Sequence, residues 1–86
     1  MKDVIPKEWL GAVVSLEDVE KDNLVDGVPF GCQAPDWEDF KAAMLEGDDV
    51  CEFASPPITW QILAGRAGYA LVRNGSAIRR IVTWMN

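Results

Sequence analysis

The dipeptide Asn74-Gly75 separates two β-prone runs, residues 68–73 and 76–85, and constrains the fold more than any other feature. Asn-Gly between such runs is the strongest short-range signal for a β-hairpin, because a type I′ turn requires positive φ at both central residues. A two-residue loop predicts three cross-strand pairs: Arg73 with Ser76, Leu71 with Ile78, and Tyr69 with Arg80. This register puts Arg73 and Arg80 on one face and Ile81 on the other. We expect both faces to be partly buried, since neither is plainly polar.

A helix and a strand are predicted in the segment between residues 36 and 54. Asp36 suits the N-cap position of a helix over residues 36–46, and Gly47 is its stop signal. Its large apolar residues follow helical spacing and form one stripe: Trp37, Phe40 and Met44. Residues 49–54 then predict a strand, in which side chains alternate between two faces.

A second, shorter helix is predicted over residues 56–64. Ser55 suits its N-cap, proline suits its first turn, and Gly65 suits the left-handed position after its end. The register of apolar residues predicts that Ile58 and Ile62 lie on one side.

The first third of the chain is less decisive. Residues 9–14 fit either a strand or a helix, because so short an apolar run has no clear period. Residues 15–21 resemble a capped helix start, and residues 26–31 have loop composition. Taken together, the elements predict one α+β domain over residues 1–86. A small antiparallel sheet with a C-terminal β-hairpin packs against two short helices, and the first 34 residues wrap around the rest.

Composition excludes several classes of function. The start of the chain lacks the basic and unbroken apolar character of a signal peptide, and no apolar run reaches the ~20 residues of a membrane span. We therefore expect a cytoplasmic protein with no membrane partner, in which Cys32 and Cys51 are reduced and unbridged. The net charge of −6 repels phosphate backbones, so we expect no nucleic-acid partner.

Charge is segregated along the chain. All 14 acidic residues lie at or before Glu52, and all four arginines lie at or after Arg66. If the two parts pack together, opposite charges meet inside one small domain. We therefore predict that at least one arginine pairs with a carboxylate from the first 52 residues.

The segment from Glu52 to Gly75 resembles a group of small uncharacterised bacterial proteins. The matching residues are Ser55-Pro56-Pro57, Trp60, Gly65-Arg66 and Ala70-Leu71-Val72-Arg73-Asn74-Gly75. The stretch Pro35-Asp36-Trp37-Glu38-Asp39-Phe40-Lys41 is also similar to theirs, so the resemblance covers roughly residues 27–82. It implies a bacterial or phage origin, and it implies no activity, because none is assigned to that group.

No residue pattern predicts catalysis or a cofactor. The chain has no histidine, which excludes Ser-His-Asp and Cys-His arrangements, and two cysteines 19 positions apart make a poor zinc site. We expect no catalytic residue, no metal and no cofactor. Arg66, in the run Gly65-Arg66-Ala67-Gly68, offers an alternative: a glycine-rich turn with an arginine can hold an anionic group.

Three hypotheses for function follow. The first is a non-enzymatic acidic module, like an immunity protein, an antitoxin or a phage inhibitor, that binds a basic protein surface. Its predicted binding residues surround the helix over 36–46: Glu38, Glu46, Asp48 and Asp49. The second is a small enzyme or ligand-binding domain that uses Arg66. The third is a subunit that forms homo-oligomers through exposed apolar surface.

Overall fold

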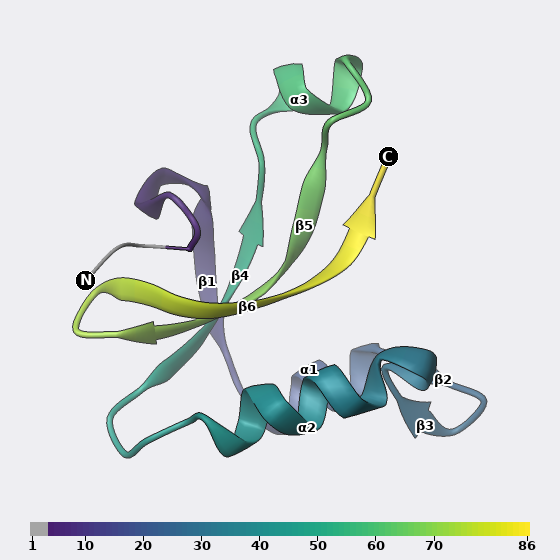
Figure 1. The fold of residues 1–86 in the computed structure, drawn as a ribbon, viewed down its shortest axis with the longest axis vertical. Coiled ribbons are helices and arrows are strands. Elements are labelled where there is room, and N and C mark those ends of the chain that lie inside the picture. The colour runs from purple at the N-terminus through teal and green to yellow at the C-terminus, as the bar shows by residue number, and fades with distance from the viewer. Residues whose placement is uncertain (1–3) are drawn as a thin grey trace.

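A four-stranded antiparallel sheet with strand order β1-β4-β5-β6 forms the centre of the structure, a computed structural model that describes residues 4–86 (Figure 1). Two helices, α1 and α2, lie across one end of the sheet, and α3 lies at the opposite end (Figure 1). The strands are β1 (Leu10–Val14), β2 (Leu24–Val25), β3 (Val28–Pro29), β4 (Asp49–Ala54), β5 (Arg66–Arg73) and β6 (Ser76–Met85). The α-helices are α1 (Leu16–Asp22), α2 (Ala34–Ala42) and α3 (Pro57–Gln61), and short 3-10 turns occupy Lys7–Trp9 and Gly31–Gln33. This arrangement confirms the predicted α+β class.

The C-terminal hairpin forms as predicted around its turn. Asn74 and Gly75 both have positive φ, 52° and 80°, and Arg73 pairs with Ser76. Beyond that pair the predicted register is wrong, because a bulge in β6 places Leu71 opposite Arg79 and Tyr69 opposite Ile81. An extra residue on one strand of a pair shifts everything that follows it by one position.

The bulge separates residues that were predicted to share a face. Arg80 lies opposite Ala70 and so projects from the face away from Tyr69 and Arg73. Ile81 moves the other way and joins the core beneath the helices. The prediction that Arg73 and Arg80 share a face is therefore wrong.

A second bulge, near the other end of the hairpin, depends on Gly68. Ala67 pairs with Trp84 whereas Gly68 pairs with Val82, so β6 again contains one extra residue. A Cβ atom on Gly68 would lie 2.0 Å from the carbonyl oxygen of Ile81. Only glycine lets the two backbones approach so closely.

Helix α2 starts and ends earlier than predicted. The backbone is already helical at Ala34, because the 3-10 turn over Gly31–Gln33 leads directly into it. Asp36 therefore lies in the first turn and is not the N-cap, which is Gln33. The helix ends at Ala42, and Gly47 takes its left-handed conformation (φ 89°) in the loop that leads to β4. Trp37 and Phe40 are buried as the apolar stripe predicts.

Helix α3 forms, but its predicted boundary residues have other roles. Its N-cap is Pro56, and the hydroxyl of Ser55 instead accepts a hydrogen bond of 2.9 Å from the backbone N–H of Arg66. The positive φ after the helix falls on Leu63 (60°) rather than on Gly65. Gly65 packs directly against Trp60: a Cβ atom at this position would lie 2.1 Å from the Trp60 ring, so a larger residue would clash.

The N-terminal third completes the sheet. Residues Leu10–Val14 are an edge strand that pairs antiparallel with β4, which resolves the choice between strand and helix. Helix α1 begins as predicted, because the Ser15 hydroxyl accepts a 3.1 Å hydrogen bond from the Asp18 N–H. The segment predicted as a loop, residues 26–31, contains β3, which pairs with β2 just before it in a two-stranded ribbon.

The sheet buries apolar side chains on both faces. The core between the sheet and the helices contains Val19, Phe30, Trp37, Phe40, Val50, Leu71 and Ile81. A smaller core on the opposite face contains Ile5, Cys51, Phe53, Ala70, Val72 and Ala77. Both cysteines are free thiols; Cys32 is exposed and Cys51 is buried. Burial, with a contribution from nearby Asp49, raises the pKa of the Cys51 thiol, as expected for an inert core residue.

We predict that Gly68→Ala destabilises the protein by about 2 kcal/mol or more, because its Cβ atom would push β5 and β6 apart. Gly11→Ala is the matched control, since its nearest neighbour, the Glu52 carbonyl oxygen, would be 3.6 Å away. Urea denaturation followed by tryptophan fluorescence measures both variants, and equal stabilities would contradict the close backbone approach.

Candidate functional site

The four carboxylates predicted to form a binding surface have different environments. Glu38 lies on α2, Glu46 and Asp48 lie in the loop after it, and Asp49 starts β4. Glu38, Glu46 and Asp49 are exposed, whereas the Asp48 side chain is only 2 % exposed. The structure thus leaves three of the four accessible to a partner.

Asp48 is held by an ion pair within the molecule. Arg73 donates two hydrogen bonds to it, from Nε to Oδ1 at 2.9 Å and from Nη2 to Oδ2 at 2.8 Å. The backbone N–H of Leu45 donates a third, at 2.8 Å. The bonds from Arg73, and then the one from Leu45, lower the pKa of the Asp48 carboxyl group. This contact confirms the prediction that an arginine pairs with a carboxylate of the first 52 residues.

Glu20 has an equally structural role, which the sequence did not reveal. Trp37 is fully buried, and its indole Nε1 donates a 2.8 Å hydrogen bond to Glu20 Oε2. Lys41 Nζ lies 2.9 Å from the same oxygen and 3.2 Å from Glu38 Oε1. The Trp37 bond, and then the Lys41 bond, lower the pKa of Glu20. A buried tryptophan needs an acceptor for its N–H, and that requirement was the available signal.

The remaining carboxylates of α1 and α2 face solvent. We call the exposed acidic residues of these two helices the acidic helical layer: Glu17, Asp18, Asp22, Asp36, Glu38 and Asp39. The two helices lie against each other through the Glu20 contacts to Trp37 and Lys41. The layer is therefore one continuous part of the molecule, although its members are up to 22 positions apart in the chain.

Arg66, the alternative anion-binding residue, starts β5 and is half-buried. Its guanidinium Nη1 donates a 2.7 Å hydrogen bond to the Gly65 carbonyl oxygen. Its backbone N–H donates a 2.9 Å hydrogen bond to the Ser55 hydroxyl oxygen. Part of its donor capacity is thus already used within its own turn.

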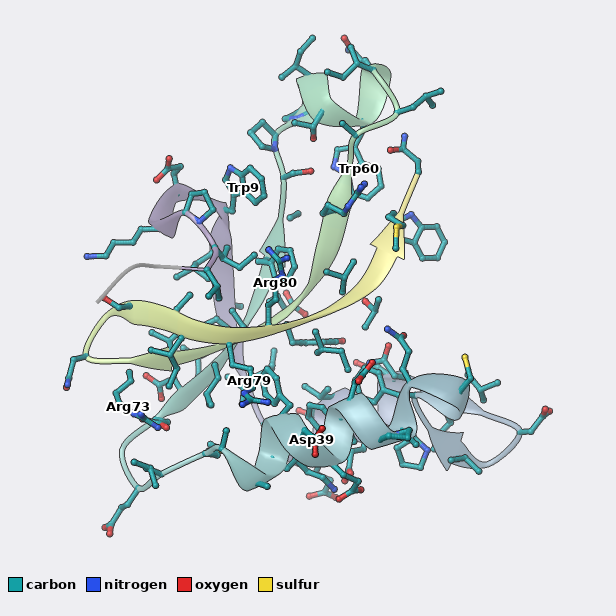
Figure 2. The ribbon with its side chains drawn as sticks, viewed as in Figure 1. Trp9, Asp39, Trp60, Arg73, Arg79 and Arg80 are labelled. Atoms are coloured by element: carbon teal, nitrogen blue, oxygen red, sulfur yellow. The ribbon has the colours of Figure 1, made fainter. Side chains whose placement is uncertain are left out.

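Arg79 and Arg80 lie on β6 and are exposed (Figure 2). Together with Asp36 and Asp39 of α2 they line a hollow of about 310 Å³. Arg80 Nη1 also donates a 3.3 Å hydrogen bond to the Val4 carbonyl oxygen. Within the described part of the chain, Arg73 is the arginine that forms an ion pair.

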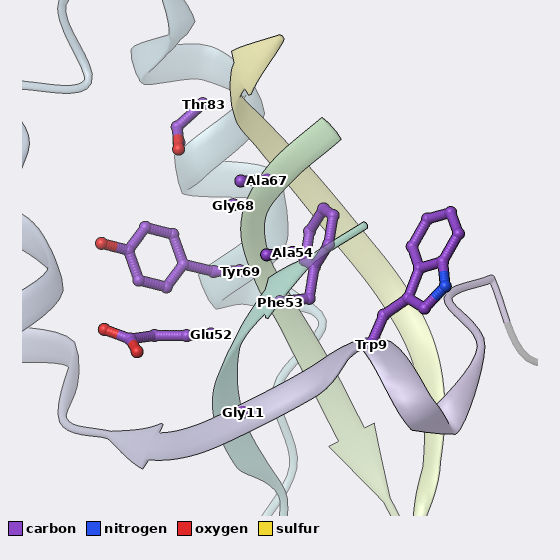
Figure 3. A pocket seen from close by; sticks show the side chains of 9 residues that line it. All are labelled: Trp9, Gly11, Glu52, Phe53, Ala54, Ala67, Gly68, Tyr69 and Thr83. Atoms are coloured by element: carbon purple, nitrogen blue, oxygen red, sulfur yellow. The ribbon is translucent and has the colours of Figure 1, made fainter. Parts of the chain in front are cut away.

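A second hollow, of about 330 Å³, lies over strands β1, β4 and β5 (Figure 3). Its lining residues are Trp9, Gly11, Glu52, Phe53, Ala54, Ala67, Gly68, Tyr69 and Thr83. The side chains of Glu52, Tyr69 and Thr83 point to one side of the sheet, and the rings of Trp9 and Phe53 point to the other (Figure 3). Sequence reasoning did not single out Glu52, because no motif surrounds it.

No known protein family, curated protein or solved structure matches this chain. Among residues 4–86, cysteine and acidic side chains do not gather in groups of three that could hold a metal ion. None of the described helices is long and apolar enough to cross a membrane.

The Asp48–Arg73 pair predicts a specific pH dependence. The pKa of Asp48 is lower in the folded state, so the pair stabilises the protein fully above the unfolded-state pKa of about 4, and the contribution is lost as pH falls through the folded-state pKa. Asp48→Asn should therefore lower the urea midpoint clearly at pH 7 and by a smaller amount at pH 3, which lies below the unfolded-state pKa. Asp49→Asn, at an exposed neighbour, is the control and should change stability by less than about 0.5 kcal/mol.

For Glu20, two substitutions separate the acceptor from the charge. Glu20→Leu leaves the buried Trp37 N–H without a partner and should cost about 1–3 kcal/mol in unfolding free energy. Glu20→Gln keeps an acceptor oxygen and loses only the ion pair with Lys41, which should cost about 1 kcal/mol or less. Equal losses in urea denaturation would show that the indole hydrogen bond does not matter.

Proposed function

We propose that this protein is a non-enzymatic interaction module that binds a basic protein surface through its acidic helical layer. The observation that carries the proposal is that α1 and α2 bury their large apolar side chains and expose their acidic ones. Their large apolar side chains, Val19, Trp37 and Phe40, are buried in the core, so the exposed sides of both helices are left to polar and charged residues. Six exposed carboxylates lie on these two helices, and two of them, Asp36 and Asp39, border Arg79 and Arg80 of β6.

The charge balance of this region supports the same function. Residues 15–43 contain eight acidic residues and two lysines, and one of those lysines, Lys41, is committed to Glu20 and Glu38. A surface of one sign accelerates the encounter with an oppositely charged partner and repels partners of the same sign. Immunity proteins, antitoxins and phage inhibitors that block cationic clefts are proteins of this kind.

The proposal shifts the binding surface relative to the sequence-based one. Glu38 stays within it, Asp48 leaves it because Arg73 occupies that carboxylate, and Glu46 and Asp49 lie beyond the end of α2. The ligand-binding alternative at Arg66 has less support, since its guanidinium already bonds to Gly65.

Self-association is a second candidate, favoured by apolar side chains around the end of β6. Trp84 is 69 % exposed and Met85 is 63 % exposed. Asn86 ties this end to the turn after α3 by hydrogen bonds to Gly65 and Trp60, and exposed Ile62 and Leu63 lie in that turn. Sedimentation velocity of the wild type and of Trp84→Ser tests it: a dimer that this substitution dissociates supports self-association, and a wild-type monomer rejects it.

Two triple variants with the same change in net charge test the acidic helical layer. The test variant combines Glu17→Lys, Glu38→Lys and Asp39→Lys, and the control combines Glu8→Lys, Glu46→Lys and Asp49→Lys. Each is immobilised and exposed to a lysate of the source organism, and retained proteins are quantified. We expect a basic protein that the wild type and the control retain and the test variant loses.

The kinetics of the retained protein complete the test. Its association with the test variant should be several-fold slower than with the wild type at low salt, and nearly equal at high salt, because salt screens exposed charges. Retention of the same proteins by all three baits would contradict a role for the helical layer.

A further inference from the structure

The hollow over β1, β4 and β5 lies on the sheet face that carries α1 and α2, in the part that these helices leave uncovered. Strand alternation puts Glu52 and Ala54 on the same face as Val50, which belongs to the core under the helices. Tyr69 and Ala67 share that face with Leu71. In Figure 1 both helices lie at the end of the sheet remote from α3.

Small residues create the space. Gly11, Ala54, Ala67 and Gly68 line the hollow, so little side-chain volume rises from its floor. Gly68 is glycine because a Cβ atom there would lie 2.0 Å from the Ile81 carbonyl oxygen, on the face opposite Ala67 and Tyr69. The depression therefore depends on the small side chains of Ala54 and Ala67 and on the absence of one at Gly11.

Tyr69 forms a fixed wall of the hollow. Its hydroxyl accepts a 2.9 Å hydrogen bond from Asn23 Nδ2, and its ring meets that of Phe30 edge-on, with centroids 6.2 Å apart. The contacts with Asn23 and Phe30 thus fix the orientation of the ring, and Tyr69 is only half-buried. An aromatic ring fixed in this way is ready to stack on a planar group without further ordering.

Glu52 supplies the charge. It lies directly opposite Tyr69 in the β4–β5 register, and the two side chains project side by side (Figure 3). It is the only charged residue among the nine that line the hollow. Within residues 4–86 its carboxylate has no ion-pair partner, unlike Glu20, Glu38 and Asp48.

We propose that this hollow receives an arginine side chain of the basic partner, an inference that rests on the proposed function. A guanidinium group is planar, stacks on aromatic faces and binds a carboxylate through two parallel hydrogen bonds. Tyr69 and Glu52 offer those two surfaces next to each other. The volume of about 330 Å³ leaves room for one arginine side chain.

The test uses a blocked glycine–arginine–glycine peptide and follows the amide signals of ¹⁵N-labelled protein by NMR. We expect shift changes to concentrate at Gly11, Ala54, Gly68 and Tyr69. The same peptide with citrulline in place of arginine keeps the shape and loses the charge, and it should bind at least about fivefold more weakly.

Two variants probe the hollow in different ways. Glu52→Gln removes the charge and Ala54→Leu fills the space, and each should weaken binding of the arginine peptide about fivefold or more. Glu46→Gln removes an exposed carboxylate elsewhere and should leave binding within about twofold. The dispersion of the amide spectrum shows whether each variant is folded.

Several results would overturn the inference. They are the absence of binding up to about 10 mM peptide, equal binding of the citrulline peptide, shifts spread over α1 and α2, or wild-type affinity in both folded variants. The helical-layer triple variant keeps the two proposals apart. Capture of a basic protein that depends on that layer but not on Glu52 would reject arginine binding in the hollow and leave the proposed function standing.

Discussion

The burial of Trp37 organises the helical half of this protein. Its ring is fully buried and stacks on Phe30 and Phe40, with centroid distances of 4.6 Å and 5.2 Å. So large a side chain contributes much apolar area, but its N–H must find an acceptor in the interior. Glu20 provides that acceptor from α1, and Lys41 balances the charge from α2. One hydrogen bond therefore joins the two helices to each other and to the core.

The segregation of charge along the chain has two consequences in space. Some of the acidic residues form ion pairs within the molecule: Asp48 pairs with Arg73, and Glu20 pairs with Lys41. Six of the other carboxylates are exposed on α1 and α2 and give these helices an acidic surface, which Arg79 and Arg80 of β6 border at Asp36 and Asp39. Exposed carboxylates steer a partner best, because the charges of Asp48 and Glu20 are largely balanced by Arg73 and Lys41. Glu38 is exposed although it lies 3.2 Å from Lys41.

The hollow proposed to bind arginine is open because α1 and α2 are too short to cover the whole face of the sheet. Helices α1 and α2 have 7 and 9 residues, and they cover one end of a four-stranded sheet. The uncovered part of the same face presents Glu52 and Tyr69 above a floor of small residues. The acidic helical layer and the hollow thus belong to one side of the molecule, where one partner could contact both.

The sequence by itself determined the features that local backbone chemistry controls: the hairpin turn at Asn74-Gly75, the capped start of α1 at Ser15, and the α+β class. It also indicated that opposite charges would meet, though not which ones. Tertiary structure decided the rest: the bulges in β6, the early start of α2, the hydrogen bond between Glu20 and Trp37, and the hollow at Glu52. Each of these depends on residues that are distant in the chain or on the close approach of two backbones. Short-range patterns contain no information about such contacts, so the candidate site appeared only once the chain was folded.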